Sequence, residues 1–226
     1  MDVTEAVSSR RSVRAFLPRR VPSAIIREIF DVTQRAPSGS NLQPWHATVL
    51  ANTALDDFRA EMVAVVAQGI GSEPAEYPMY PANLPDPYRK RRYETAEVMY
   101  DALKIAREDK RSRLAWVARN FDFFNAPVGM IVHMPALMVS TQWADLGIWM
   151  QTVMLLSRDH GLDSCAQEAW SLFPVSVRRT LSLPDDHMIF AGMAIGYADP
   201  NAPVNSIRSH RAAVSEHVDF RGVDSI

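Results

Sequence analysis

The chain has 226 residues, 22% of them charged, and a formal net charge of −2. This length predicts one domain with a sizeable core, and the nearly balanced charge excludes a protein that holds nucleic acid by a basic field. The chain has one cysteine, which excludes a disulfide framework. It has no apolar run long enough to cross a bilayer. We therefore expect a cytoplasmic protein without nucleic-acid or membrane partners.

The first third of the chain predicts three helices, a loop and a strand. The helices show apolar residues at helical spacing, and the second must end before Pro37 because the residue before a proline is biased out of the helix. Small polar residues mark the loop and alternation marks the strand. The elements are expected at residues 4–10 (helix), 22–36 (helix), 38–41 (loop), 45–51 (strand) and 55–68 (helix).

The middle of the chain has a different character. Five prolines interrupt residues 71–87, so no regular element can form there, and the tyrosines among them predict that the segment packs against the body. Residues 86–113 follow with nine Lys or Arg against six Asp or Glu, which is typical of one or two solvated helices. The basic run at 89–92 has no basic patch beside it, which favours a solvated face over a nucleic-acid site.

The last part of the chain predicts three strands and one long helix. The strands are expected at 127–134, 162–166 and 188–197. The helix, residues 140–160, is capped by Gly161 and is apolar nearly all round. Such a helix should be buried on every face, which in a chain of this size suggests a subunit interface as well as a core. Strands separated by helices predict a layered α/β or α+β sheet.

Alternate polar residues follow the first predicted helix. Arg10, Ser12 and Arg14 would lie on one side of an extended chain. Two guanidiniums and a hydroxyl suit a phosphate, because arginine donates in a planar fork that matches phosphate oxygens. A second cationic cluster, with Arg208 and Arg211, lies near the other end. Each cluster alone is more typical of ordinary surface arginines, but together they suggest that both ends bind one anionic cofactor.

The most specific stretch of the sequence is residues 36–45. A Pro-Ser-Gly turn there exposes backbone N–H groups, and Asn41 and Gln43 add amides that can read the edge of a planar ligand. The chain resembles the FMN-dependent nitroreductase family over nearly its whole length. The resemblance rests on the order and spacing of three stretches, which are residues 10–16, residues 36–45 and the C-terminal cationic cluster.

The resemblance implies an α+β fold of three layers, a central β-sheet flanked by helices, in an intertwined homodimer. It implies a single FMN-binding domain over residues 1–226 with a lid insertion around 72–120. The implied cofactor is FMN. The implied cofactor-binding residues are Arg10, Arg11, Ser12, Arg14, Pro37, Ser38, Gly39, Asn41, Gln167, Glu168, Arg208 and Arg211.

Each implied residue has a role in the family pattern. Arg10 and Ser12 match positions that hold the phosphate and ribityl chain, and Arg14 matches a cation at the pyrimidine edge of the flavin. The residues at 37–41 match a loop that lines the ring of an FMN bound mainly by the other subunit. Arg211, and with it Arg208, matches a C-terminal phosphate ligand.

The strand at 162–166 leads to the residues implied to lie near flavin N5, Gln167 or Glu168. Here the sequence departs from the family pattern. Ala166 stands where many relatives have proline, and Ala169 stands where many have glycine.

The resemblance also implies the chemistry. NAD(P)H would deliver hydride to flavin N5, and an aromatic acceptor would then take the electrons in a ping-pong cycle, so we expect no catalytic side chain. A guanidinium beside the pyrimidine edge would favour the reduced cofactor. The region 88–127 resembles the branch of nitrobenzoate reductases. Its basic run at 89–92 would either bind the carboxylate of an aromatic acid or form the solvated face of a helix. Quinones remain alternative electron acceptors.

Two other functions stay open. The first is reductive dehalogenation of halogenated aromatics, as in iodotyrosine deiodinase, although its lid pattern of Glu, Tyr and a distant Lys is absent here. The second is a flavin-binding storage or sensor protein without turnover. The six histidines are scattered without ligand spacing, so we expect no metal site. Cys165 lies in an apolar strand and is expected to be a buried structural thiol.

Overall fold

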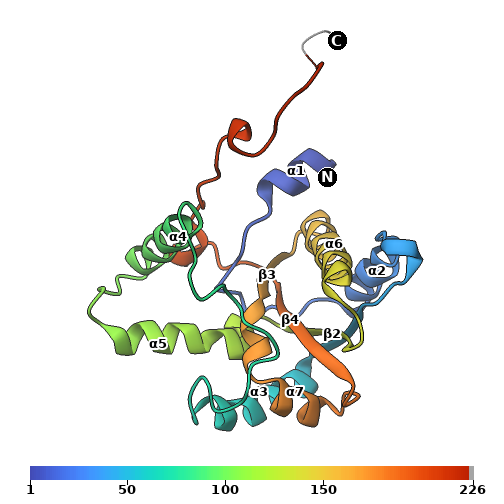
Figure 1. Ribbon diagram of the computed structural model, residues 1–226. Helices are drawn as coiled ribbons and strands as arrows, with labels where there is room; N and C mark the ends of the chain where they lie inside the picture. Colours follow the sequence, from blue (N-terminus) through green and yellow to red (C-terminus); the bar gives the residue numbers. More distant parts are fainter. Residues whose placement is uncertain (224–226) are drawn as a thin grey trace.

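The computed structural model describes residues 1–223 and contains a four-stranded antiparallel sheet between two layers of helices (Figure 1). The strand order is β1-β2-β4-β3. The bounds of the strands are His46–Ala51 for β1, Val128–Pro135 for β2, Asp163–Gln167 for β3 and His187–Gly196 for β4. All four predicted strands are confirmed, with ends shifted by at most one residue, and so is the expected three-layer α+β fold.

The alternation of side chains along β2 explains the three layers. Ile131 faces a core shared with α3 (Asn52–Val66) and α7 (Pro174–Leu181). Its neighbours Met130 and Val132 face a second core, shared with α2 (Ser23–Thr33) and α6 (Ser140–Asp159). Because successive strand residues point to opposite faces, a strand buried along its whole length builds a core on both sides.

Two glycines allow aromatic side chains to lie directly on the sheet. A Cβ built on Gly192 would lie 2.1 Å from Trp170, and one built on Gly129 would lie 2.7 Å from the ring of Phe123. The two rings pack together with centroids 4.6 Å apart. Any larger residue at either glycine would push this pair off the sheet.

The chain ends lie outside the three layers. Helix α1 (Val3–Ser9) begins at Asp2, whose side chain accepts from the Glu5 N–H, and packs near one end of α6. At the other terminus, the segment after Asn205 leaves the body and extends past α1 (Figure 1). No helix within residues 1–223 is long and apolar enough to span a membrane.

The middle of the chain adds no fully buried residue to either core, although Trp116 and Tyr77 pack against the two cores from outside. No residue from 66 to 120 is buried. This part contains α4 (Tyr88–Ala102) and α5 (Lys110–Ala118), which extend to one side of the sheet (Figure 1). The two helices confirm the prediction of solvated helices over 86–113. The irregular segment before them also packs on the body as predicted, because Tyr77 contacts Trp143 with ring centroids 4.8 Å apart.

The chain returns from α5 to β2 through a left-handed turn. Phe123, Phe124 and Asn125 have φ angles of 52°, 53° and 60°. Consecutive left-handed residues other than glycine are costly and need external support. Arg59 of α3 provides it, because its Nε and Nη2 atoms donate to the main-chain oxygens of Asp122 and Ala126, at 2.9 and 2.6 Å.

Two features differ from the expectations. The sequence predicted no helix between 166 and 188, yet α7 forms there, beginning at Pro174. Its N-terminus is capped from afar by the carboxylate of Glu73, which accepts from the Val175 N–H at 2.8 Å. The expectation that α6 is buried on every face is wrong for the single chain, since Ile148 is 43% exposed and no described element covers it.

Candidate functional site

The segment after α1 forms a cationic cluster, defined as Arg10, Arg11, Ser12 and Arg14. All four residues are half-buried. None of the three arginines forms an ion pair within residues 1–223. The Nε atom of Arg11 is buried without an acceptor from the described chain. Half-buried guanidiniums without carboxylates are typical of a binding site for an anion.

The cationic cluster is fixed against the beginning of β3. Ser12 pairs with Ser164 in a parallel bridge, and the Val13 N–H donates to the Ser164 oxygen at 3.0 Å. Val13 is fully buried and anchors the segment. Burial raises the pKa of the neighbouring Cys165 thiol, and the charge of Arg14, a hydrogen bond with Ser12 and the charge of Arg10 oppose that shift. Cys165 itself is 2% exposed, which confirms the predicted buried thiol.

The beginning of the C-terminal segment also contacts this cluster. The Arg14 N–H donates to Oδ1 of Asn205 at 2.9 Å, and Nδ2 of Asn205 donates to the Ala15 oxygen at 2.7 Å. Arg208 and Arg211 follow within six residues, but both are exposed and donate only to oxygens of the tail itself. The structure therefore brings Asn205, the first residue of the predicted C-terminal cluster, to the cationic cluster.

The opposite end of β3 carries the second predicted pair. Gln167, three residues beyond Ser164, lies about 10 Å away along the strand. It is 2% exposed, and its Nε2 atom donates to the Asn120 oxygen at 2.7 Å, whereas its Oε1 atom is buried without a donor from the described chain. Glu168 is exposed, but the protein around its carboxyl desolvates it and raises its pKa. One strand thus joins two of the predicted clusters.

The predicted loop at 37–41 lies elsewhere, against the first half of α6. The Gly39 N–H donates to Oδ1 of Asp145 at 3.0 Å. Pro37, Gly39 and Asn41 are exposed and Ser38 is half-buried. The loop backbone is strained, because Ser40 and Asn41 have φ angles of 48° and 57°.

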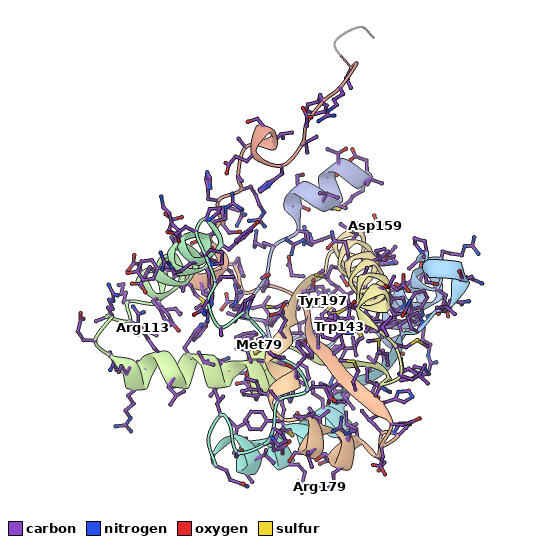
Figure 2. All side chains as sticks on the ribbon, viewed as in Figure 1. Met79, Arg113, Trp143, Asp159, Arg179 and Tyr197 are labelled. Atoms are coloured by element: carbon purple, nitrogen blue, oxygen red, sulfur yellow. The ribbon has the colours of Figure 1, made fainter. Side chains whose placement is uncertain are left out.

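A single chain holds this loop apart from the cationic cluster. Arg158 lies 13 residues beyond Asp145, about 20 Å along the helix, and donates to Oγ of Ser9, next to the cluster. Figure 2 shows the two ends of α6, marked by Trp143 and Asp159, well separated, with Asp159 on the side of α1. The loop and the cluster therefore occupy opposite ends of one helix.

The irregular segment 71–87 contacts the helical turn Glu168–Leu172, which follows β3, and is held by several polar contacts. The Glu76 N–H donates to the Ser171 oxygen at 2.9 Å, and its carboxylate pairs with Arg178 at 2.6 Å. The Tyr77 hydroxyl donates to the main-chain oxygen of Phe190. Burial raises the pKa of Tyr77 to about 12, so this donor keeps its proton at neutral pH.

Local partners surround the basic run at 89–92. Arg89 pairs with Asp86 and Lys90 lies 3.8 Å from Glu94. The other two contacts are Arg91 to Glu216, at 2.8 Å, and the Arg92 guanidinium over the ring of Tyr80, at 4.1 Å. These contacts favour the interpretation of the run as a solvated helix face.

Sequence reasoning missed a cluster of three histidines on neighbouring strands. The Nδ1 atoms of His133 and His187 lie 2.8 Å apart, and the ring of His46 lies 4.7 Å from that of His187. Burial and the two neighbouring rings lower the pKa of His133 to about 4. Burial also lowers the pKa of His187. Spacing along the chain could not reveal this cluster, because strand register creates it.

Comparisons with known proteins show the family of the chain. The model of the nitroreductase family matches residues 7–197. A 4-nitrobenzoate reductase from Pseudomonas putida is 36% identical over 99% of this chain and 97% of its own. The FMN and NADPH-dependent nitroreductase NfnB from Sphigopyxis sp. strain HMH is 43% identical, with a TM-score of 0.95 over 98% of this chain and all of that chain. The FMN-dependent nitroreductase NfnB from Mycobacterium smegmatis, in complex with NADPH, is 31% identical with a TM-score of 0.91 over 96% and 97% of the two chains.

Proposed function

The chain belongs to the nitroreductase family, and from that premise we propose that it is an FMN-dependent oxidoreductase that uses NAD(P)H to reduce nitroaromatic compounds. The observation that carries this proposal is the cationic cluster. It combines half-buried arginines that have no carboxylate partner within residues 1–223 and the Nε atom of Arg11, which is buried without an acceptor from the same residues. These donors fit the phosphate of FMN.

The residues divide the binding of FMN between them. The phosphate and ribityl chain of FMN would be held by Arg10, Arg11 and Ser12. Two further donors to the phosphate would come from the C-terminal segment, namely Arg208 and Arg211. Asn205 fixes the backbone of Arg14, whose Nη1 atom also donates to the Ser12 oxygen at 3.3 Å. The proposed place of the Arg14 guanidinium is the pyrimidine edge of the ring, where a positive charge favours electron uptake.

The chemistry that FMN supplies when bound is the transfer of a hydride equivalent from NAD(P)H to an electron-poor acceptor. Near the reacting end of the ring we place Gln167 and Glu168. The amide of Gln167 is held by Asn120, and its free Oε1 atom can accept from a ligand N–H. We assign no side chain as nucleophile.

We also propose that the protein is a homodimer in which the loop 37–41 lines the FMN held mainly by the other subunit. The separation of loop and cluster along α6 supports this, because one chain places them at opposite ends of the helix. Ile148 on α6 is exposed, and the C-terminal segment exposes Val214 and Phe220. An obligate dimer would cover this apolar surface within an interface of about 2,000–5,000 Å². A stable FMN-loaded monomer in light scattering would contradict the dimer.

Residues 72–120 are proposed to form the lid or wall over the flavin that sets the acceptor. The segment contributes no buried residue, and Glu76 in its first part contacts Ser171, three residues beyond Glu168, which we place near the reacting end of the ring. The proposed acceptors are small nitroaromatics, nitrobenzoate among them, and the expected compartment is the cytoplasm. Fractionation of cells followed by detection of the protein tests that location.

An anaerobic spectroscopic titration tests the function. The purified protein should be yellow with about one FMN per chain, as one phosphate cluster per chain implies. NAD(P)H should bleach the flavin absorbance, and 4-nitrobenzoate should restore it. The flavin could instead be bleached by NAD(P)H but reoxidised by no nitroaromatic, quinone or halogenated aromatic. That result would indicate a sensor. Reoxidation by a halogenated aromatic alone would indicate a dehalogenase.

A further inference from the structure

The loop 37–43 has a backbone that its own residues do not favour. Ser40, Asn41 and Gln43 all have φ angles between 48° and 57°, in the region that residues with a Cβ rarely adopt. Its internal hydrogen bonds are short-range, such as the Gln43 N–H to Oγ of Ser38 at 3.0 Å. Local bonds of this kind form in many turns, so they do not by themselves select this conformation.

A single hydrogen bond ties the loop to the rest of the described chain. The Gly39 N–H donates to Oδ1 of Asp145 across 106 positions of sequence, at 3.0 Å. Within residues 1–223 no other hydrogen bond joins residues 37–43 to another element. Asp145 is therefore the one polar anchor of the strained loop in this part of the chain.

An aspartate is an unusual residue at a buried position without a cation. Asp145 is 6% exposed and forms no ion pair within residues 1–223. Its Oδ2 atom is buried and accepts no hydrogen bond from the described residues. A Cβ built on Gly39 would lie 3.9 Å from this same oxygen, so both carboxylate oxygens face the loop.

A buried carboxylate without a cation lowers the stability of a fold, and such groups gather where function requires them. An asparagine could provide the same acceptor for the Gly39 N–H without the charge. Because the hydrogen bond alone does not require a carboxylate, the aspartate at this position points to a role for its negative charge next to the loop.

We propose that Asp145 is a positioning residue of the cofactor site, which holds the loop 37–43 in its left-handed conformation and sets a negative charge behind it, toward the flavin ring. The inference rests on the proposed function, because that function places the loop against the ring. In the proposed dimer the loop and Asp145 lie against the FMN held mainly by the other subunit. The charge of Asp145 opposes electron uptake by that flavin, whereas the Arg14 guanidinium of the subunit that holds it favours electron uptake, so the two charges together set the reduction potential.

The hydrogen bond and the charge can be separated by two substitutions. Asp145→Ala removes both, and Asp145→Asn keeps an acceptor for the Gly39 N–H but removes the charge. Asp57→Asn is the control, because it removes one charge from an exposed position of α3 that forms no ion pair within residues 1–223. The measurements are amide exchange at residues 39–41 without FMN, FMN affinity, the flavin midpoint potential and the thermal midpoint of the apoprotein.

We expect Asp145→Ala to speed amide exchange at residues 39–41 at least tenfold and to weaken FMN binding by a similar factor. Asp145→Asn should keep both within threefold of the wild type but raise the midpoint potential. Both variants should keep or raise the thermal midpoint, because an uncompensated buried charge has been removed. A purely structural residue would lower the thermal midpoint and leave the potential unchanged.

The proposal would be overturned if Asp145→Ala exchanged its amides and bound FMN as the wild type does. It would also be overturned if the midpoint potential of Asp145→Asn equalled that of Asp57→Asn. If Asp145→Ala does not fold, the potential of Asp145→Asn decides alone. A wild-type protein that binds no FMN would refute the proposed function and this inference together. A wild-type protein that binds FMN and reduces nitroaromatics, with unaffected Asp145 variants, would refute the inference only.

Discussion

Arg113 and Glu97 form a two-pronged ion pair that joins α5 to α4, with distances of 2.7 and 3.3 Å between their paired atoms. The Arg113 guanidinium also lies 4.0 Å from the centre of the Tyr100 ring. Donation by Arg113 lowers the pKa of Glu97, so the pair stays charged well below neutral pH. Neither helix carries a buried residue, so this pair is a main link between them.

Arg113→Met should therefore loosen the two helices without disturbing FMN. We expect faster amide exchange confined to α4 and α5, a changed KM for the nitroaromatic acceptor and unchanged FMN retention. Lys90→Met, which removes an exposed pair at 3.8 Å, is the control and should change none of these. Loss of FMN in Arg113→Met would show that these helices help to hold the cofactor.

Arg10→Ala tests the phosphate site. Loss of one charged donor should weaken FMN binding by about 2 kcal/mol, or about thirtyfold. Arg211→Ala should act in the same direction if the C-terminal segment completes the site. Exposed Arg20 serves as the control, and fluorescence titration of the apoprotein measures all three affinities. Equal FMN affinity in Arg10→Ala and Arg20→Ala would refute the proposed phosphate site.

Arg14→Ala should affect the redox properties more than the choice of acceptor. Its backbone bond to Asn205 survives the substitution, so the local fold is kept while the guanidinium is lost. We expect a lower flavin midpoint potential and an equal slowing for nitrobenzene and nitrobenzoate, because the lost charge acts on the cofactor. Redox titration beside steady-state kinetics checks this, and an unchanged potential would place Arg14 away from the ring.

The buried histidines predict a loss of stability in mild acid. His133 has a pKa of about 4 in the folded chain and about 6.5 when unfolded. Between these values the unfolded chain binds a proton that the folded chain does not. The free energy of unfolding therefore falls as the pH falls through this window, by about 3 kcal/mol at its acid end. Above about pH 6.5 this histidine contributes no pH dependence.

Urea unfolding at several pH values measures this effect. His133→Gln should flatten the slope of stability between pH 6.5 and 4, even if its absolute stability is lower. His217→Gln, at an exposed position, should keep the wild-type slope. Identical slopes for the two variants would mean that His133 is protonated in the fold.

Arg59→Met tests the support of the left-handed turn. The substitution removes two charged donors from the Asp122 and Ala126 oxygens while keeping most of the apolar stem. We expect a loss of about 3 kcal/mol in the free energy of unfolding. Arg27→Met, at an exposed position of α2, should change it by less than about 0.5 kcal/mol. A small effect of Arg59→Met would mean that Phe123 and Phe124 hold the turn by packing alone.

Local pattern was enough to predict the strands and most helices. Periodicity located the strands to within one residue, and the segment 71–87 was recognised by its prolines. Helix α7 escaped prediction because its N-terminal cap comes from Glu73, about a hundred positions earlier. The left-handed turn escaped for a related reason, since phenylalanines do not favour that conformation and Arg59 imposes it from another helix.

The candidate site could be predicted only where it is contiguous in sequence. The cationic cluster and the loop 37–41 were visible as motifs. Asp145 was hidden among the apolar residues of α6, and only the folded chain shows that it bonds Gly39. The histidine cluster depends on strand register in the same way. The roles of the implied cofactor residues stay predictions for the experiments above.

The absence of buried residues between 66 and 120 has a consequence for engineering. The two ends of this stretch are fixed, at Tyr77 by Phe190 and at the turn after α5 by Arg59. Residues 78–119 can therefore be treated as an exchangeable cassette, transplanted from relatives or randomised in libraries, provided that Trp116, which packs against the core, is kept. A selection for new nitroaromatic substrates would best begin there.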